Sequence, residues 1–221
     1  LMKRLIVPVE IVSSLDPNDK SGSVGIGEAR YQTETVPLNY SIFFENVPTA
    51  TAPAQEVVIT DQLDMANMDL NTFSLGLITF GDRLITPPPG LSQYTTDVDL
   101  RPANNLIVRI NAGLDKATGL ATWRFISLDP ATRLPTDDPL AGFLPPNKNS
   151  PEGQGSVLFS VKPKQGIATG TEIRNKARIV FDVNEPIDTP EWLNTLDNTA
   201  PTSHMLPLAA IQSPNFLIGW D

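Results

Sequence analysis

The sequence predicts an all-β fold, a β-sandwich with long proline-rich loops and extended terminal strands. The 221 residues include 21 Pro and 14 Gly, scattered between short runs of Val, Ile, Thr, Phe and Leu. Proline at this density disfavours long helices and marks turns and strand edges. Apolar residues make up 40% and charged residues 19% of the chain, which is typical of a globular protein that buries its own core.

The expected strands follow from period-two alternation and β-branched enrichment. A leading strand at 4–12 is followed by a polar, Gly-rich loop at 14–27. The remaining strands are expected at 37–46, 55–63, 72–80, 94–100, 106–112, 120–128, 156–163 and 172–183. Trp123 and Phe125 alternate with Arg124, which predicts one core-facing side for the strand at 120–128.

The connections between strands carry their own signals. Asp115 to Gly119 has hairpin-turn chemistry, and residues 129–155 form a long loop with six prolines. Helical structure is limited to one turn near 64–70 and one near 190–196. The composition of the sequence changes after Asn198, and residues 199–203, Thr-Ala-Pro-Thr-Ser, are typical of a linker.

We therefore divide the chain into a leading strand or tail at 1–13, a sandwich at 14–198, and a final segment at 199–221. The final segment reads as a linker with the first strand of a following domain, or as a docking tail. The segments 5–12 and 216–220 are apolar and strand-forming, which predicts that they pair with neighbouring domains or other copies by strand addition. The alternative for the first run is an edge strand within this sandwich.

Charge and composition exclude several classes of function. The net charge of −9 and the pI of about 4.6 disfavour nucleic acid, and no basic run favours an anionic membrane surface. No stretch of apolar residues is long enough to insert into a membrane. The chain has no cysteine, which excludes disulfides and zinc–thiolate sites.

Two acidic loops, one before the first core strand and one after the last long strand, predict a calcium site. Ca²⁺ prefers carboxylate, amide and carbonyl oxygens, which both loops carry. The candidate ligands are Asp16, Asn18, Asp19, Asp182, Asn184 and Glu185. The alternative is that these side chains form Asx-turns and cap backbone amides. A further group, Asp61, Asp64 and Asp69, reads as a solvated turn.

No enzymatic activity is expected. His204, the one histidine, falls in the apparent linker, and the sequence has neither a Gly-x-Ser-x-Gly nucleophile motif nor a phosphate-binding loop.

The sequence also contains candidate residues for two self-modification reactions. Lys20 or Lys176 could form an isopeptide link with Asn175 or Asn184. Alternatively, the chain could cleave itself at an Asp-Pro bond, of which there are three, beginning at Asp16, Asp129 and Asp138. Both reactions require a buried acid, which a sequence does not reveal.

Several blocks carry a resemblance to a family. They are the opening Asp16-Pro-Asn-Asp-Lys20, the segments 38–46, 52–63 and 142–146, and the closing Ile-x-Asn-x-Ala-x-Ile-x-Phe-Asp-x-Asn-x-Pro-Ile at 173–187. Over residues 14–203 the chain resembles an uncharacterised Ig-like module of very large secreted or surface repeat proteins of bacteria. The resemblance implies an Ig-like β-sandwich and a secreted or cell-surface location, and it implies no activity.

The expected function is therefore a structural or adhesive module of an extracellular fibre, filament or large surface protein, stiffened by calcium and assembled through its terminal strands. The alternative is a carbohydrate- or protein-binding accessory module of a secreted protein, with a surface glycan or a protein as ligand. An exposed row of Tyr94, Trp123 and Trp192 would favour this alternative.

Overall fold

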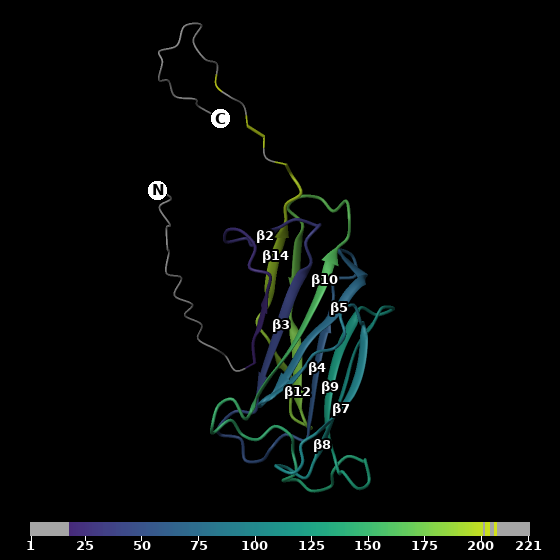
Figure 1. Cartoon of the computed structure of the whole chain (residues 1–221). Helices are drawn as coiled ribbons and strands as arrows, with labels where there is room; N and C mark the ends of the chain where they lie inside the picture. Colours follow the sequence, from purple (N-terminus) through teal and green to yellow (C-terminus); the bar gives the residue numbers. More distant parts are fainter. Residues whose placement is uncertain (1–17, 201, 204–205, 207–221) are drawn as a thin grey trace, which may run out of the picture.

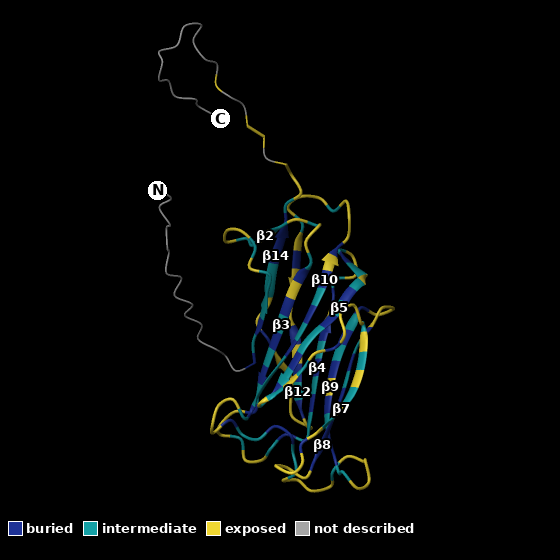
Figure 2. Cartoon of the chain, in the orientation of Figure 1, coloured by how far each residue is buried: buried dark blue, intermediate teal, exposed yellow. Residues whose placement is uncertain are grey.

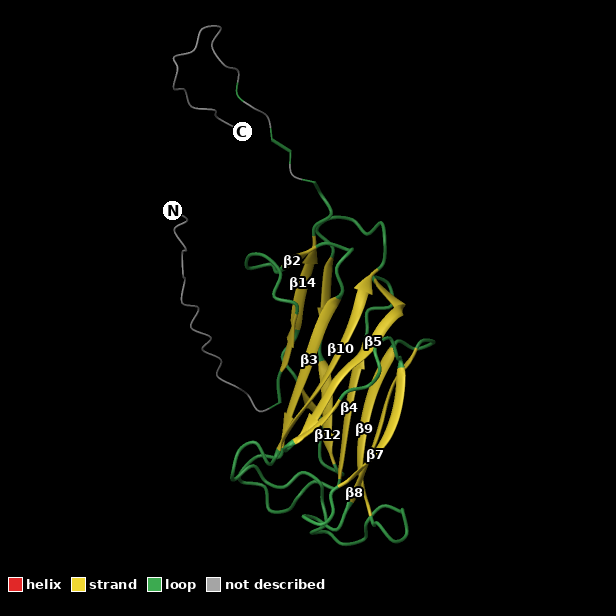
Figure 3. Ribbon diagram, viewed as in Figure 1, coloured by secondary structure: helices red, strands yellow, loops and turns green. Residues whose placement is uncertain are grey.

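The computed structural model describes residues 18–200, 202–203 and 206. All regular structure in this part of the chain is β-strand, as Figure 3 shows. Two antiparallel sheets pack face to face, and a small third sheet extends them at one end (Figure 1). The predicted all-β sandwich is therefore confirmed.

The first sheet has five strands in the order β1-β3-β10-β5-β6. Strands β3 and β10 pair antiparallel along almost their whole length, and β10 also pairs with β5 through two register shifts. The strands are β1 (Lys20–Gly22), β3 (Leu38–Glu45), β5 (Met68–Phe80), β6 (Arg83–Ile85) and β10 (Gln154–Pro163).

The second sheet has six strands in the order β13-β12-β4-β9-β8-β7. Its strands are β4 (Glu56–Gln62), β7 (Gln93–Asp99), β8 (Ile107–Asp115), β9 (Leu120–Leu128), β12 (Ala177–Phe181) and β13 (Ile187–Asp188). The third sheet has the order β11-β14-β2 and consists of β2 (Tyr31–Gln32), β11 (Glu172–Asn175) and β14 (Trp192–Leu196), with β14 and β2 parallel.

Aromatic side chains fill the space between the two large sheets. Trp123 and Phe125 on β9 are fully buried, as predicted, and Arg124 between them is exposed. The ring centres of Trp123 and Phe159 of β10 are 5.5 Å apart, and those of Phe125 and Phe44 of β3 are 5.4 Å apart. These contacts cross from one sheet to the other, and each buried ring of this size stabilises the fold by about 1.5–3 kcal/mol. Figure 2 shows this core as buried strand segments between exposed loops.

Strand positions agree with the sequence wherever alternation is strong, but several local predictions are wrong. The single strand predicted at 172–183 is two strands, β11 and β12, which belong to different sheets. Residues 14–27 are not loop throughout, because β1 pairs there with β3. The expected helical turn at 64–70 is a tight turn followed by the start of β5 at Met68. The expected helical turn at 190–196 is strand β14, whose backbone hydrogen-bonds to β11 and β2. The predicted hairpin at Asp115 is present, with Gly119 at φ +73°.

The described chain enters and leaves the sandwich at separate places. Figure 1 shows it entering in the lower half, beside β3, and leaving beyond β14 at the upper end. The long loop at 129–155, green in Figure 1, lies at the lower end. No helix of the described residues is long and apolar enough to cross a membrane. The predicted terminal strands at 5–12 and 216–220 lie outside the described residues.

Candidate functional site: a buried Lys–Asp–Asn cluster

Three polar side chains from three different sheets meet in the core. Lys20 lies on β1, Asp61 on β4 and Asn175 at the end of β11. Their exposed fractions are only 2%, 1% and 3%. Buried charged residues of this kind are uncommon unless they are paired, so the cluster is the most unusual chemical feature of the fold.

Strand alternation explains why each side chain points inward. Lys20 is paired directly with Ile42, which is fully buried, and directly opposed residues share one face of a sheet. Asp61 continues the inward row that begins with the buried residues Val57 and Ile59. Asn175 follows the buried Ile173 by two positions. Each polar residue thus occupies a position where the pattern calls for an apolar side chain.

The Lys20 amine is the centre of the cluster. Its Nζ donates a hydrogen bond to Asn175 Oδ1 at 2.6 Å and forms a short ion pair with Asp61 Oδ2. The Nζ also lies 4.7 Å from the centre of the Tyr40 ring and 5.2 Å from that of Phe159. The amine is therefore in contact with a carboxamide and a carboxyl group inside an aromatic enclosure.

Burial shifts both ionisable groups toward their neutral forms. Desolvation lowers the pKa of Lys20, against the opposing effects of the Asp61 charge and hydrogen bond. Desolvation raises the pKa of Asp61, although Lys20 and, to a smaller extent, Asn175 act in the opposite direction. Burial thus acts on the pair in the direction of a neutral amine next to a protonated carboxyl group.

Two atoms of the cluster lack hydrogen-bond partners among the described residues. They are Asp61 Oδ1 and Asn175 Nδ2, an acceptor and a donor that are both buried. An unsatisfied buried polar atom costs about 1–3 kcal/mol, and folded proteins carry few of them. The cluster is therefore not an optimised, static hydrogen-bond network.

The structure corrects the interpretation of one acidic group. Asp61 is not part of a solvated turn, because its carboxyl group is fully buried. Asp64 and Asp69 do lie in turns, where Asp64 Oδ1 accepts from the Ala66 amide at 2.9 Å and Asp69 Oδ1 accepts from the Asn71 amide at 3.1 Å.

The other self-modification candidates are exposed. Lys176, next to Asn175 in sequence, faces outward and forms an ion pair with Asp188 at 3.2 Å, and Arg178 binds the same carboxylate at 2.7 Å. Asn184 is also exposed. Among the isopeptide candidates in the described chain, Lys20 and Asn175 alone are both buried and in contact with each other.

The described members of the predicted calcium site are held by local hydrogen bonds. Asp182, at φ +52°, accepts from the amides of Gln55 and Glu56 through Oδ1, at 2.9 and 2.8 Å. Asn18 Oδ1 accepts from the Glu45 amide at 3.3 Å, and Asp19 Oδ1 accepts from the Lys20 amide at 2.7 Å.

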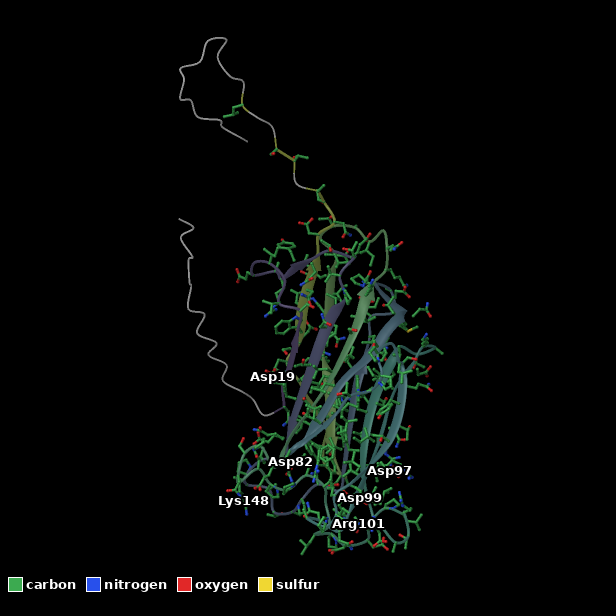
Figure 4. The ribbon with its side chains drawn as sticks, in the orientation of Figure 1. Asp19, Asp82, Asp97, Asp99, Arg101 and Lys148 are labelled. Atoms are coloured by element: carbon green, nitrogen blue, oxygen red, sulfur yellow. The ribbon has the colours of Figure 1, made fainter. Side chains whose placement is uncertain are left out.

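Asn184 and Glu185 are exposed, and Asp16 lies outside the described residues. Figure 4 shows Asp19 beside the entry point of the chain, well away from Asp97, Asp99 and Arg101. Within 18–200, 202–203 and 206, no three acidic, His or Cys side chains are grouped so that they could hold a metal ion. The calcium site stays a prediction.

Two further sequence expectations concern binding and cleavage. Trp123 is buried in the core, and Tyr94 and Trp192 pack partly buried against it, so the aromatic row expected of a binding module is not formed. The carboxylates of Asp129 and Asp138 accept backbone hydrogen bonds within their own turns. His204 lies outside the described residues.

Comparison with solved structures finds low-identity similarity. The C-terminal domain of the Streptococcus pyogenes antigen I/II-family protein AspA is 15% identical with a TM-score of 0.43, and the match covers 83% of this chain and 47% of that one. BcpA, the major pilin subunit of Bacillus cereus, is 16% identical with a TM-score of 0.44, covering 85% and 40%. The collagen-binding domain from a Staphylococcus aureus adhesin is 12% identical with a TM-score of 0.39, covering 84% and 100%.

The chain thus spans less than half of the AspA and BcpA structures. The search of curated proteins gives no match. One protein family matches, at residues 16–79 and 140–195, and these segments carry all three residues of the buried cluster. Because they make up more than half of the sequence, the chain belongs to the family described as a domain of unknown function, DUF7619.

Proposed function

We propose that this chain is a load-bearing structural module of an extracellular or cell-surface protein, in which it transmits tension between the segments on either side. The supporting observation is the cluster that ties the first described strand to the strands by which the chain leaves. Lys20 lies two residues after the start of the described chain, and it reaches Asn175 on β11. Strand β11 in turn pairs with β14, the last strand.

Tension applied at the two ends therefore meets this cluster, whose ion pair is the only one among the described residues with both side chains fully buried, before it reaches the inner strands of the large sheets. The entry and exit points lie apart along the sandwich (Figure 1), so tension acts lengthwise on β1 and β14. Loading strands lengthwise strains several ladder hydrogen bonds together rather than one after another. This arrangement suits a domain placed in series with others.

A surface location agrees with the composition. The net charge of −9 keeps a long polymer soluble, and the absence of cysteine is compatible with an oxidising exterior. The BcpA and collagen-binding structures are pilin and adhesin parts by their own descriptions, and an adhesive or structural role at a bacterial surface is proposed here for this chain. The binding-module alternative lacks support from exposed aromatic side chains.

Single-molecule pulling along two directions tests the proposal. Because the chain has no cysteine, introduced cysteines give unique attachment points. One form carries a cysteine at each terminus. The comparison form carries Lys116→Cys and Lys148→Cys, two exposed positions in loops, of which Lys148 is labelled in Figure 4.

We expect a higher unfolding force when the domain is pulled through its ends than through the two loops. Circular dichroism of both forms before pulling verifies that the substitutions leave the fold intact. An equal or lower force through the ends would contradict a load-bearing role.

A further inference from the structure

The buried cluster has the parts of a reaction as well as those of an ion pair. An amine nucleophile, a carboxamide and an acid lie in contact, with Lys20 Nζ hydrogen-bonded to Asn175 Oδ1 and paired with Asp61 Oδ2. Holding reactants in such contact replaces an encounter in solution by an intramolecular step. The enclosure by Tyr40 and Phe159 keeps the site away from bulk water.

We propose that Lys20 and Asn175 join in a covalent isopeptide bond inside the folded domain, with Asp61 as the catalytic acid and base. The reaction goes beyond the proposed mechanical role, because it depends on the cluster alone and could occur in a domain of any function. It needs no cofactor and no oxidant.

The neutral Lys20 amine attacks Cγ of Asn175, and the Cγ–Nζ bond forms as the carbonyl electrons move to Oδ1. Asp61, starting as the protonated acid, donates its proton to the developing oxyanion or to the leaving nitrogen and accepts one from the amine. The tetrahedral intermediate then collapses, the Cγ–Nδ2 bond breaks, and Nδ2 leaves as ammonia. The products are one secondary amide, one ammonia and the regenerated acid.

The site favours this outcome over a permanent ion pair in two respects. Attack requires an uncharged amine, and burial shifts Lys20 in that direction while it shifts Asp61 toward the protonated form that can donate. The reaction also removes Asn175 Nδ2, a buried donor without a hydrogen-bond partner among the described residues. Loss of this nitrogen as ammonia ends the penalty of burying it.

A static buried salt bridge is the competing explanation. It accounts for Lys20, for Asp61 and for the hydrogen bond to Asn175 Oδ1, but it leaves Asn175 Nδ2 buried without a hydrogen-bond partner among the described residues. The fold also needs no such pair for its stability, because a buried ion pair is often no better than apolar side chains of similar volume. The position of Asn175 is the feature that favours the reaction.

Intact mass spectrometry of the purified, folded chain tests the proposal. We expect a mass below the sequence mass by one ammonia. Digestion should then yield one branched peptide in which the segment containing Lys20 is joined to the segment containing Asn175. A full sequence mass in the folded protein would overturn the proposal, and so would a link at any other lysine.

Variants separate the roles of the three residues. Lys20→Met and Asn175→Ala should each have the full mass calculated from the variant sequence, with no loss of ammonia. Lys176→Met, which changes the exposed neighbouring lysine, should still be lighter than its calculated mass by one ammonia. Asp61→Asn keeps the shape of the side chain and should keep the full mass, because it removes the acid. If folded Asp61→Asn forms the link as completely as the wild type, Asp61 has no catalytic role.

Should Asp61→Asn fail to fold, the wild-type mass and the branched peptide still decide whether the bond exists. The mass measurement is independent of the pulling experiment, so failure of the cross-link and failure of the load-bearing role can be told apart.

Discussion

Asn175→Ala isolates the contribution of the proposed cross-link to stability. The substitution removes the carboxamide and leaves Lys20 and Asp61 paired, so no lone buried charge is created. Lys20 and Asn175 are 155 positions apart in sequence, and the link closes a loop of that length in the unfolded chain. The chain-entropy relation used for disulfides gives about 5 kcal/mol for such a loop.

That free energy corresponds to a fall in the unfolding midpoint of about 10–20 °C for a domain of this size. Thermal unfolding followed by circular dichroism measures it, with Lys176→Met as the matched surface control. The denaturant dependence of unfolding should also be steeper in the variant, because the unlinked chain exposes more surface when it unfolds.

The double variant gives the sharpest test of the reasoning. A single bond can be lost only once, so Lys20→Met combined with Asn175→Ala should be little less stable than Lys20→Met alone, which already loses both the bond and the partner of Asp61. If the two losses of free energy add, the residues act through ordinary contacts and the cross-link argument is wrong. A midpoint of Asn175→Ala within about 3 °C of the wild type would refute the estimated magnitude.

Four other predictions follow from the same geometry. Asp182→Ala should lower the free energy of unfolding by about 1–2 kcal/mol, measured by chemical unfolding, because two backbone amides lose their acceptor. Asp182→Asn should lower it less, because Asn tolerates a positive φ and keeps an acceptor oxygen. Hydrogen bonds from Arg178 and Lys176 lower the pKa of Asp188 to about 2. The stability that these bonds give the folded state is therefore present above about pH 4 and is lost as the pH falls toward 2. A carboxyl titration by NMR with a midpoint near 4 would contradict this. The calcium prediction for the two acidic loops expects a midpoint that rises with free Ca²⁺, and a midpoint unchanged by chelator would exclude it. Pulled through its ends, the Asn175→Ala form should release about 500 Å more chain than the linked wild type.

Strong alternation made most of the fold predictable. The strand at 120–128 is predicted at its observed bounds because Trp123 and Phe125 alternate with polar neighbours between two turn-forming segments. Strand β14 was mistaken for a helical turn because its short sequence, Trp-Leu-Asn-Thr-Leu, has no clean alternation. Its backbone is satisfied by β11, and that pairing is tertiary information absent from the local sequence.

The site was only partly predictable. Lys20 and Asn175 were candidates for a link, but the acid that they need was assigned to a solvated turn. A signal for its burial did exist, since Asp61 keeps step with Val57 and Ile59 in a period of two. Lys20 offered no such signal, because β1 has three residues and its inward direction comes entirely from pairing with β3.

The position of the proposed bond along the chain connects the chemistry to the mechanical role. Covalent linkage of residue 20 to residue 175 would route tension from the entry segment into Asn175, at the end of β11, and then along β12, β13 and β14 to the exit. Residues 21–174, which include every strand of the two large sheets except β12, β13 and the first residue of β1, would then bear none of that tension. Hydrogen-bonded strands yield under sustained force, whereas an amide bond does not, so such a domain would stay folded under loads that unfold the unlinked form. The placement of the reactive residues near the two ends of the domain, rather than anywhere else in its core, is what a load-bearing module requires.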